Sequence, residues 1–402
     1  MIMTTDSIKK LIKEKKIITP AYLLDLSVLD EHMKKIDEIC HGTVDLCYAM
    51  KANPFLVKKM DEYVHRIEVC SPGELEICRF HEIPGEDIVF SGVNKTAEDV
   101  KTAMEYGVDV ITLESIKHFN LVRDYCLKNK ASVKVLPRLS SGAQFGMDEE
   151  ELRQIISGRE DYPFLDIIGI HYFTGTQKKS LDKDIEEIDY IDGLIKDLKS
   201  AYGYDCKVFE YGAGLSVPYF EGDRFDDIYG DLIRLVDHVK KLEAEYETVF
   251  EMGRFFVFSC MDYLTAVDDI KRSSDTNICL VDGGIHQLNY YGYNMAMRTP
   301  RLDIIRMGSE PEAATGSIDE DDSNWKVYGS LCTFADILVR KADFGSLSLG
   351  DVLVFHNTGA YSTTEAPALF LSRKMADIYL VENETQDPRV IRQDRQSYEI
   401  NI

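Results

Sequence analysis

A lysine ends a short strand-like run in the stretch CYAMKANP, residues 47–54. The end of a buried strand is a costly place for an ammonium group unless the site uses its chemistry. A desolvated lysine is partly neutral, and only the neutral amine attacks an aldehyde to form a Schiff base. Lys51 is therefore the first candidate for covalent catalysis, although a solvated loop lysine would be favoured if this motif stood alone.

Two glycines follow another apolar run, in the stretch KVFEYGAG that ends at residue 214. Residues with small or missing side chains let backbone N–H groups approach a phosphate closely. Gly212, Ala213 and Gly214 are candidates for that role, and a tight turn is the alternative.

A carboxylate and an arginine end a third apolar run, ETVFEMGR. Arg254 offers a planar, bidentate donor that suits a phosphate or a carboxylate. Glu251 either acts on a bound group or forms a structural ion pair with Arg254. The chain also holds nine cysteines. A thiol can donate a proton to carbon, although a free cysteine is more often a small buried hydrophobic residue.

The elements that position these residues alternate regularly. Eight short apolar runs are separated by charged segments with helical spacing, which favours a closed (β/α)8 barrel of the TIM type over an open sheet. The runs are VDLCYAM, IEVC, DIVFSG, DVITLE, VKVLPRL, LDIIGIHY, CKVFEYG and ETVFEMG. The chemistry of such barrels gathers at the carboxyl ends of the strands, where Lys51, His171, Gly212 and Glu251 fall.

The sequence changes character after about residue 266. NICLVDGG, KVYGSLC, ADILVRKADF, DVLVFHN and ADIYLVEN are typical of strands separated by turns, with few helical runs. We predict a barrel domain over 27–265 and a β-rich domain over 266–402 together with 1–26. The acidic stretch 308–324 is predicted to be an exposed loop.

Charge and composition exclude some functions. The 402 residues include 46 Lys+Arg and 70 Asp+Glu, a net charge of −24, which argues against wholesale binding to nucleic acid or to an anionic membrane. The N-terminus lacks the apolar core of a signal peptide, and no run approaches the roughly eighteen apolar residues of a membrane span. An odd number of cysteines without a CxxC pair predicts free thiols and a cytoplasmic enzyme, and we expect no metal site.

Seven motifs occur in order along nearly the whole chain: YAMKAN (48–53), SPGEL (71–75), HYFTGTQ (171–177), YGAGLSVPY (211–219), EMGR (251–254), GSLCTFAD (329–336) and NTGAY (357–361). Together they resemble the fold-type III pyridoxal-phosphate decarboxylases, the group that holds diaminopimelate decarboxylase and relatives of ornithine decarboxylase. The resemblance implies an alanine racemase-like barrel with a C-terminal, mainly β domain. It also implies pyridoxal 5'-phosphate as cofactor and release of CO2 from an amino acid through a quinonoid intermediate.

The resemblance implies catalytic roles for three residues. Lys51 would hold the cofactor as a Schiff base, Glu251 would keep the pyridine nitrogen protonated, and Cys332 would deliver a proton to Cα. Only Cys332 matches the catalytic cysteine of the family, and the other cysteines are expected to be buried hydrophobic residues.

Further residues are expected to bind the cofactor. Phe173 stands in the place of a family histidine that stacks on the pyridine ring, and Thr176 in the place of a serine that binds the phosphate. Glu68 replaces an aspartate near the lysine. The full predicted set is Lys51, Glu68, Phe173, Thr176, Gly212, Ala213, Gly214, Glu251, Arg254 and Tyr361.

The substrate-binding positions depart from the family pattern. Thr333 follows Cys332 where diaminopimelate decarboxylases carry a glutamate for the distal amino group, and their Arg-Pro-x-x-Tyr segment is missing. We therefore expect discrimination against diaminopimelate. The remaining motifs look more like the subgroup that acts on amino acids tethered to acyl-carrier proteins. The substrate-binding candidates are His171, Arg254, His286, Arg298 and Thr333, with structural roles left open for His171, His286 and Arg298.

The resemblance also implies a head-to-tail homodimer in which Cys332 and Tyr361 reach different active sites. A carrier protein would need a basic patch on this acidic chain, for instance around Lys178, Lys179 and Lys183. Two alternatives stay open from the sequence: an amino-acid racemase on the same architecture, and a non-catalytic regulator that resembles a decarboxylase.

Overall fold

The computed structural model describes residues 3–223, 227–273, 276–290, 297–308, 324–383 and 386–402. The chain divides into two compact units. The barrel unit comprises Met33–Val217 and Asp227–Phe256, and the β unit comprises Met1–His32, Pro218–Asp226 and Val257–Ile402. Most of the predicted acidic loop, 309–323, lies outside the described residues.

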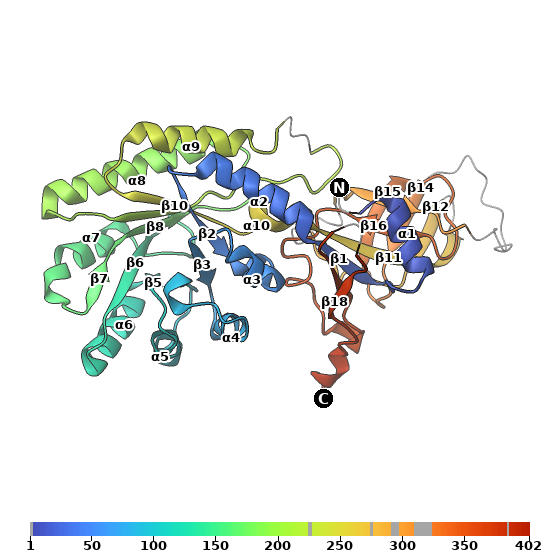
Figure 1. The fold of residues 1–402 in the computed structure, drawn as a ribbon, viewed down its shortest axis with the longest axis horizontal. Helices are drawn as coiled ribbons and strands as arrows, with labels where there is room; N and C mark the ends of the chain where they lie inside the picture. Colours follow the sequence, from blue (N-terminus) through green and yellow to red (C-terminus); the bar gives the residue numbers. More distant parts are fainter. Residues whose placement is uncertain (1–2, 224–226, 274–275, 291–296, 309–323, 384–385) are drawn as a thin grey trace. The chain divides into compact units, whose positions relative to one another are not determined.

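Parallel strands close on themselves in the barrel unit, and helices surround them (Figure 1). The strands are β2 (Asp45–Ala49), β3 (Arg66–Val69), β4 (Ile88–Phe90), β5 (Val110–Leu113), β6 (Val133–Leu139), β7 (Leu165–Ile167), β8 (Gly169–Phe173), β9 (Val208–Gly212) and β10 (Glu247–Met252). The pairings of β5 with β6 and of β2 with β10 complete the ring. β7 and β8 both pair with β6 and together fill one position, so the predicted (β/α)8 barrel is confirmed.

Local sequence signals explain where several helices of this unit begin. Pro72 opens α4 as the first helical residue while the side chain of Ser71 accepts the N–H of Glu74, which accounts for the motif SPGEL. Thr96 and Asp99 form a capping box at the start of α5. The helices are α3 (Val57–Met60), α4 (Pro72–Phe80), α5 (Ala97–Tyr106), α6 (Ile116–Asn129), α7 (Glu149–Ser157), α8 (Leu181–Tyr202), α9 (Gly230–Leu242) and α10 (Arg254–Val257), with α2 (Leu26–Cys40) before them.

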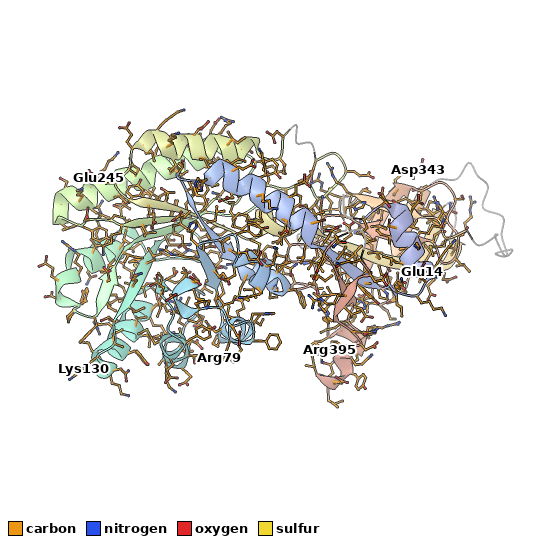
Figure 2. All side chains as sticks on the ribbon, in the orientation of Figure 1. Glu14, Arg79, Lys130, Glu245, Asp343 and Arg395 are labelled. Carbon is orange, nitrogen blue, oxygen red and sulfur yellow. The ribbon has the colours of Figure 1, made fainter. Side chains whose placement is uncertain are left out.

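The interior of the barrel has an apolar layer with polar residues above it. The apolar layer contains Cys47, Val89, Val110, Leu136, Ile168, Val208 and Val249. Side chains two residues apart on a strand face the same way. Thr112, Arg138, Glu210 and Glu251 each lie two residues beyond a member of that layer, toward the carboxyl ends of the strands. This alternation places charged groups inside the barrel at its catalytic end. The outer face carries exposed charges such as Arg79, Lys130 and Glu245 (Figure 2).

The β unit is built on a sheet in the order β15-β14-β12-β11-β1-β17-β18, with β16 joining β11 to β13. Its strands are β1 (Ala21–Asp25), β11 (Met261–Ser273), β12 (Thr276–Val281), β13 (Leu302–Ile305), β14 (Asn324–Tyr328), β15 (Ile337–Asp343), β16 (Val352–Phe355), β17 (Asp377–Val381) and β18 (Arg389–Arg392), and its N-terminal helix is α1 (Thr5–Lys13). Short 3-10 helices are η1 (Met50–Ala52), η2 (Pro54–Leu56), η3 (Gly85–Asp87), η4 (Arg159–Asp161), η5 (Phe258–Cys260), η7 (Phe370–Ser372) and η8 (Ser397–Glu399).

The contact-based limits of the units differ from the predicted domain limits of 27–265 and 266–402. Strand β11 pairs with β1, β12 and β16, so its first residues, 261–265, belong to the β unit. The segment Pro218–Asp226 also belongs there, and Phe220 forms a β-bridge with Pro300. Among the described residues, none of the helices is long and apolar enough to span a membrane.

Candidate active site

Lys51 lies in η1, directly after strand β2, at the carboxyl end of the barrel. Its Nζ is 2.5 Å from Oε2 of Glu68 and 3.9 Å from Oε1 of Glu251. It also lies 3.4 Å from Sγ of Cys70. The side chain is 38% exposed, so two carboxylates rather than full burial balance the ammonium group. The expected desolvation of Lys51 is therefore only partial in this structure.

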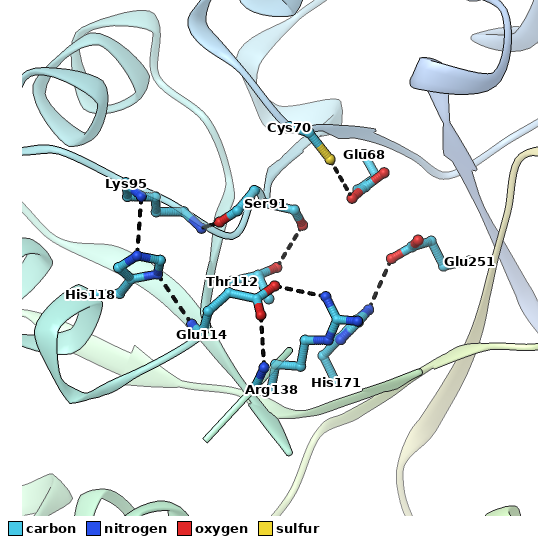
Figure 3. A network of polar contacts seen from close by, with 12 residues as sticks. Glu68, Cys70, Ser91, Lys95, Thr112, Glu114, His118, Arg138, His171 and Glu251 are labelled. Carbon is cyan, nitrogen blue, oxygen red and sulfur yellow. Dashed lines mark hydrogen bonds and ion pairs between the residues drawn. The ribbon is translucent and has the colours of Figure 1, made fainter. Parts of the chain in front are cut away.

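Glu251 on β10 and His171 on β8 meet inside the barrel, from the two strands that flank β9. Nε2 of His171 is 2.9 Å from Oε2 of Glu251 (Figure 3). Burial alone would raise the pKa of Glu251, but the charges of Lys51, His171 and Arg138 lower it to about 2. Glu251 is thus an anion at neutral pH, as a group that holds a proton on a ring nitrogen must be.

The residues predicted to bind a phosphate come together between two loops. Nε of Arg254 donates to Oγ1 of Thr176 at 3.3 Å. Gly214 has a φ of +62°, and a Cβ there would lie 2.1 Å from the carbonyl oxygen of Gly175. The backbone N–H of Lys178 donates to the carbonyl of Gly214 at 3.1 Å, so the loops after β8 and β9 run side by side. Glycine is required at 214 by both conformation and space.

Phe173 occupies the predicted stacking position at the end of β8. A Cβ on Gly212 would lie 2.3 Å from Cδ2 of Phe173, so the glycine makes room for the ring. The guanidinium carbon of Arg138 lies 5.5 Å from the ring centroid, within cation–π range. Ala213 beside this pair is fully buried.

Lys178 does not contribute to a basic surface patch. Its Nζ lies 2.7 Å from Oδ1 of Asp184, 2.8 Å from Oε2 of Glu187 and 2.9 Å from the hydroxyl of Tyr211. Lys179 and Lys183 are exposed. The patch suggested for carrier docking thus retains two of its three lysines.

Sequence reasoning did not single out a polar network inside the barrel. Nη1 of Arg138 lies 2.7 Å from Oε1 of Glu114, and Oε2 of Glu114 accepts the N–H of Gly146 at 2.9 Å. Lys95 is buried, and its Nζ donates to the carbonyl of Gly92 (2.7 Å). The burial of Lys95 lowers its pKa to about 8. The available signal was a charged residue between apolar neighbours near the end of a predicted strand, such as the arginine of VKVLPRL.

The remaining candidates belong to the β unit. Cys332 is exposed in the loop between β14 and β15, and Tyr361 has a left-handed φ of 64°. His286 is buried, and burial together with Arg373 lowers its pKa to about 4. Nη2 of Arg298 lies 2.5 Å from Oδ1 of Asp223, and its guanidinium carbon lies 4.6 Å from the ring centroid of Phe220. These contacts suit structural roles for His286 and Arg298, and substrate contact by either stays a prediction.

A comparison with protein families decides the class. Residues 26–258 match the family described as "Pyridoxal-dependent decarboxylase, pyridoxal binding domain". The chain belongs to this family. The enzyme is a lyase that releases CO2 from an amino acid with pyridoxal phosphate as cofactor. The predicted family, fold, cofactor and enzyme class are confirmed.

Relatives of this decarboxylase act on different substrates, as their names state. It is 28% identical over 385 residues to L-glutamyl-[BtrI acyl-carrier protein] decarboxylase of Niallia circulans, covering 89% of this chain and 87% of that protein. It is 26% identical over 393 residues to 2-[(L-alanin-3-ylcarbamoyl)methyl]-2-hydroxybutanedioate decarboxylase of Staphylococcus aureus, covering 91% and 95%. The structure of diaminopimelate decarboxylase from Helicobacter pylori complexed with L-lysine shares the fold, with a TM-score of 0.83, 20% identity and 98% coverage of both chains.

The barrel unit of the decarboxylase fits pyridoxal phosphate. When bound, this cofactor withdraws the electron pair that is left on Cα as CO2 departs. Lys51 offers an amine for the aldehyde, and Glu251 offers an anionic carboxylate 3.9 Å from that amine. Arg254, Thr176 and the close approach of backbone at Gly214 suit the phosphate. The role of each residue remains a prediction.

Proposed function

We propose that this decarboxylase acts on an α-amino acid other than diaminopimelate, carried through its side chain on an acyl-carrier protein. The α-carboxylate must be free because it leaves as CO2, so a carrier can be joined only to the far end of the substrate. The neutral Thr333 beside Cys332 carries the proposal. The similarity to a decarboxylase named for an L-glutamyl group on an acyl-carrier protein supports it.

Thr333 cannot balance the charge of a distal ammonium group. Its Oγ1 accepts the backbone N–H of Ala335 at 3.3 Å, and its own N–H donates to the carbonyl of Leu331 at 2.9 Å. The hydroxyl therefore already has a partner in its own loop. A free distal amine would lose its ionic partner here, whereas a neutral thioester or amide needs none.

Each side chain has one task in the proposed reaction. Lys51 would hold the cofactor covalently through its amine. Glu251 would hold a proton on the ring nitrogen, and Arg254 with Thr176 would hold the phosphate. Cys332 donates its thiol proton to Cα after CO2 has left.

A panel of substrates tests the proposal. CO2 release is measured from free L-glutamate, L-lysine, L-ornithine and meso-diaminopimelate, and from glutamate loaded through its side chain on a carrier protein. We expect the carrier-bound amino acid to have a kcat/KM at least about a hundredfold above that of any free one. Efficient turnover of meso-diaminopimelate would overturn the proposed substrate while leaving the enzyme class intact.

Introducing a carboxylate at position 333 is expected to shift the specificity. Thr333→Glu should raise kcat/KM for meso-diaminopimelate by about tenfold or more, because the new anion pairs with the distal ammonium group. The same variant should lose activity on the carrier-bound substrate. Thr333→Gln serves as the matched control of similar size without charge, and an equal gain in both variants would argue against an ionic effect.

We also propose that the enzyme is a homodimer in which Cys332 serves the active site of the partner subunit. Phe334, two residues after Cys332, is fully exposed, and Leu369, Phe370 and Leu371 are also exposed. Nη2 of Arg373 donates to the carbonyl of Ser330 at 2.9 Å, which joins the two loops that carry these residues. Exposed apolar residues on the loop of Cys332 and on the loop joined to it favour a surface that is covered in the assembled enzyme.

Mixing two inactive variants tests the shared site. Lys51→Ala and Cys332→Ala homodimers are each expected to be nearly inactive. After dissociation and remixing in equal amounts, about a quarter of the wild-type rate should return, because half of the dimers are mixed and each of those has one intact site. Failure to recover activity, with exchange of subunits shown by mass, would contradict a shared site.

The cytoplasm is the proposed location. All nine cysteines lie within the described residues and are free, as expected in a reducing compartment.

A further inference from the structure

Glu210 is a carboxyl group inside the barrel that the proposed reaction does not use. It lies in the middle of strand β9, two residues beyond Val208 of the apolar layer, and is fully buried. Neither of its oxygens has a hydrogen-bond donor among the described residues. Burying a carboxyl group without such a partner costs free energy. We therefore look for a role of Glu210 in the effect of its charge on a neighbouring side chain.

We propose that Glu210 is a positioning residue that controls the charge of His171 and, through it, keeps Glu251 aimed at the ring nitrogen of the cofactor. The structure sets His171 between the two carboxyl groups. Its Nε2 lies 2.9 Å from Oε2 of Glu251 and 4.0 Å from Oε1 of Glu210. The proposal rests on the role of Glu251 given above and is independent of the identity of the substrate.

The surroundings of His171 favour coupling between the two carboxyl groups. Its neighbouring strands bring Arg138 from β6 and Glu210 from β9 into register with it. Glu251 on β10 contacts the His171 ring. The carboxylate of Glu114, which pairs with Arg138, also interacts electrostatically with His171. Nδ1 of His171 has no hydrogen-bond partner among the described residues, so the contacts of Nε2 are the ones that fix the charge of the ring.

The groups around Glu210 make its ionisation sensitive to pH near neutrality. Nη1 of Arg66 is 4.0 Å from its Oε2, and the thiol of Cys47 and the carboxylate of Glu68 also act on it. Burial raises the pKa of Glu210 to about 7, against the attraction of His171. As pH rises through this value, Glu210 gains its negative charge where an isolated imidazole, with a pKa of about 6.5, would lose its positive one. The negative charge that Glu210 gains lies 4.0 Å from Nε2 of His171.

The titration of His171 in the full-length, cofactor-loaded enzyme tests the proposal directly. The protein is labelled with 15N-histidine and kept in a metal chelator, and the His171 ring signals are assigned as those missing from His171→Gln. In Glu210→Gln the pH at which His171 loses its proton should fall by at least about one unit, because the opposing charge is gone. The pH midpoint of the absorbance of the bound cofactor should move as well.

Two further variants keep the result interpretable. Glu210→Asp retains the charge and should restore most of the His171 titration. Asp192→Asn removes another buried carboxylate of the barrel unit, one that accepts the hydroxyl of Tyr246 at 2.9 Å, and should leave that titration unchanged. An unchanged His171 midpoint in folded Glu210→Gln would overturn the proposal, since a purely structural Glu210–Arg66 pair predicts that result. If Glu210→Gln does not fold, the uncharged variant Glu210→Asn decides by the same midpoint, which must fall as expected for Glu210→Gln.

Discussion

Replacing Lys51 by alanine is expected to lower kcat by at least about a thousandfold, because the covalent attachment that holds the cofactor in place is lost. The amine of Lys51 lies between Glu68 and Glu251 at the carboxyl end of β2, where an aldehyde can reach it. The effect is measured by CO2 release and by the loss of the visible absorbance of the bound cofactor. Borohydride reduction of the wild-type enzyme, followed by mass spectrometry, should place the pyridoxyl group on Lys51.

Two other lysines provide the controls for this experiment. Lys58 is exposed on α3 and pairs with Asp61 at 3.4 Å, so Lys58→Ala should retain full activity. Lys95 is a second lysine at the same end of the barrel, and burial lowers its pKa to about 8. Attachment of the pyridoxyl group to Lys95 would contradict the assignment to Lys51.

The barrel could be predicted from the sequence because each strand is buried on both sides. Such strands are apolar almost throughout, whereas the helices between them alternate apolar and charged residues with a period of about 3.6 residues. The two patterns are easy to tell apart in the sequence. The four residues placed at strand ends, Lys51, His171, Gly212 and Glu251, lie in or directly after their predicted strands.

The limits of the units and the polar interior could not be predicted in the same way. Residues 261–265 follow the last barrel strand in sequence, but their partners are β1 and β16, which are distant in the chain. Glu210 and Arg138 each lie among apolar residues of their strands, and the pairing of β8 with both strands places His171 between them. Long-range pairing, rather than local propensity, decides such positions.

The surface charge of Lys178 shows a second reason why sequence reasoning falls short. Three nearby lysines, at 178, 179 and 183, indicate a basic patch. Acidic residues in the first turns of α8 can pair with one of these lysines and neutralise its charge. Asp184 and Glu187 both pair with the amine of Lys178. The backbone N–H of Lys178 donates to the carbonyl of Gly214, so this lysine stabilises the loop and does not add charge to the surface. Side-chain partners of long, flexible residues are set by the fold around them.

Replacing Glu251 by glutamine is expected to lower kcat by about a hundredfold or more while keeping the cofactor bound. Glutamine has the size of glutamate but no negative charge, so it cannot hold a proton on the ring nitrogen. Burial favours the neutral acid, yet Lys51, His171 and Arg138 lower the pKa of Glu251 to about 2, so the wild-type group is ionised throughout the range from mildly acidic to alkaline pH. The loss should therefore be nearly independent of pH. It is measured from kcat and from the spectrum of the bound cofactor.

A control must show that the effect of Glu251→Gln comes from this particular carboxylate and not from the loss of any carboxylate on the strand. Glu247 lies at the exposed start of the same strand, β10, so Glu247→Gln should keep the wild-type rate. Glu251→Asp retains the charge at a shorter reach and should lie between Glu251→Gln and the wild type. A wild-type kcat in Glu251→Gln would mean that the electron sink does not need a protonated ring nitrogen in this enzyme. The cluster of Lys51, His171 and Arg138 around Glu251 would then serve only to hold the barrel interior together.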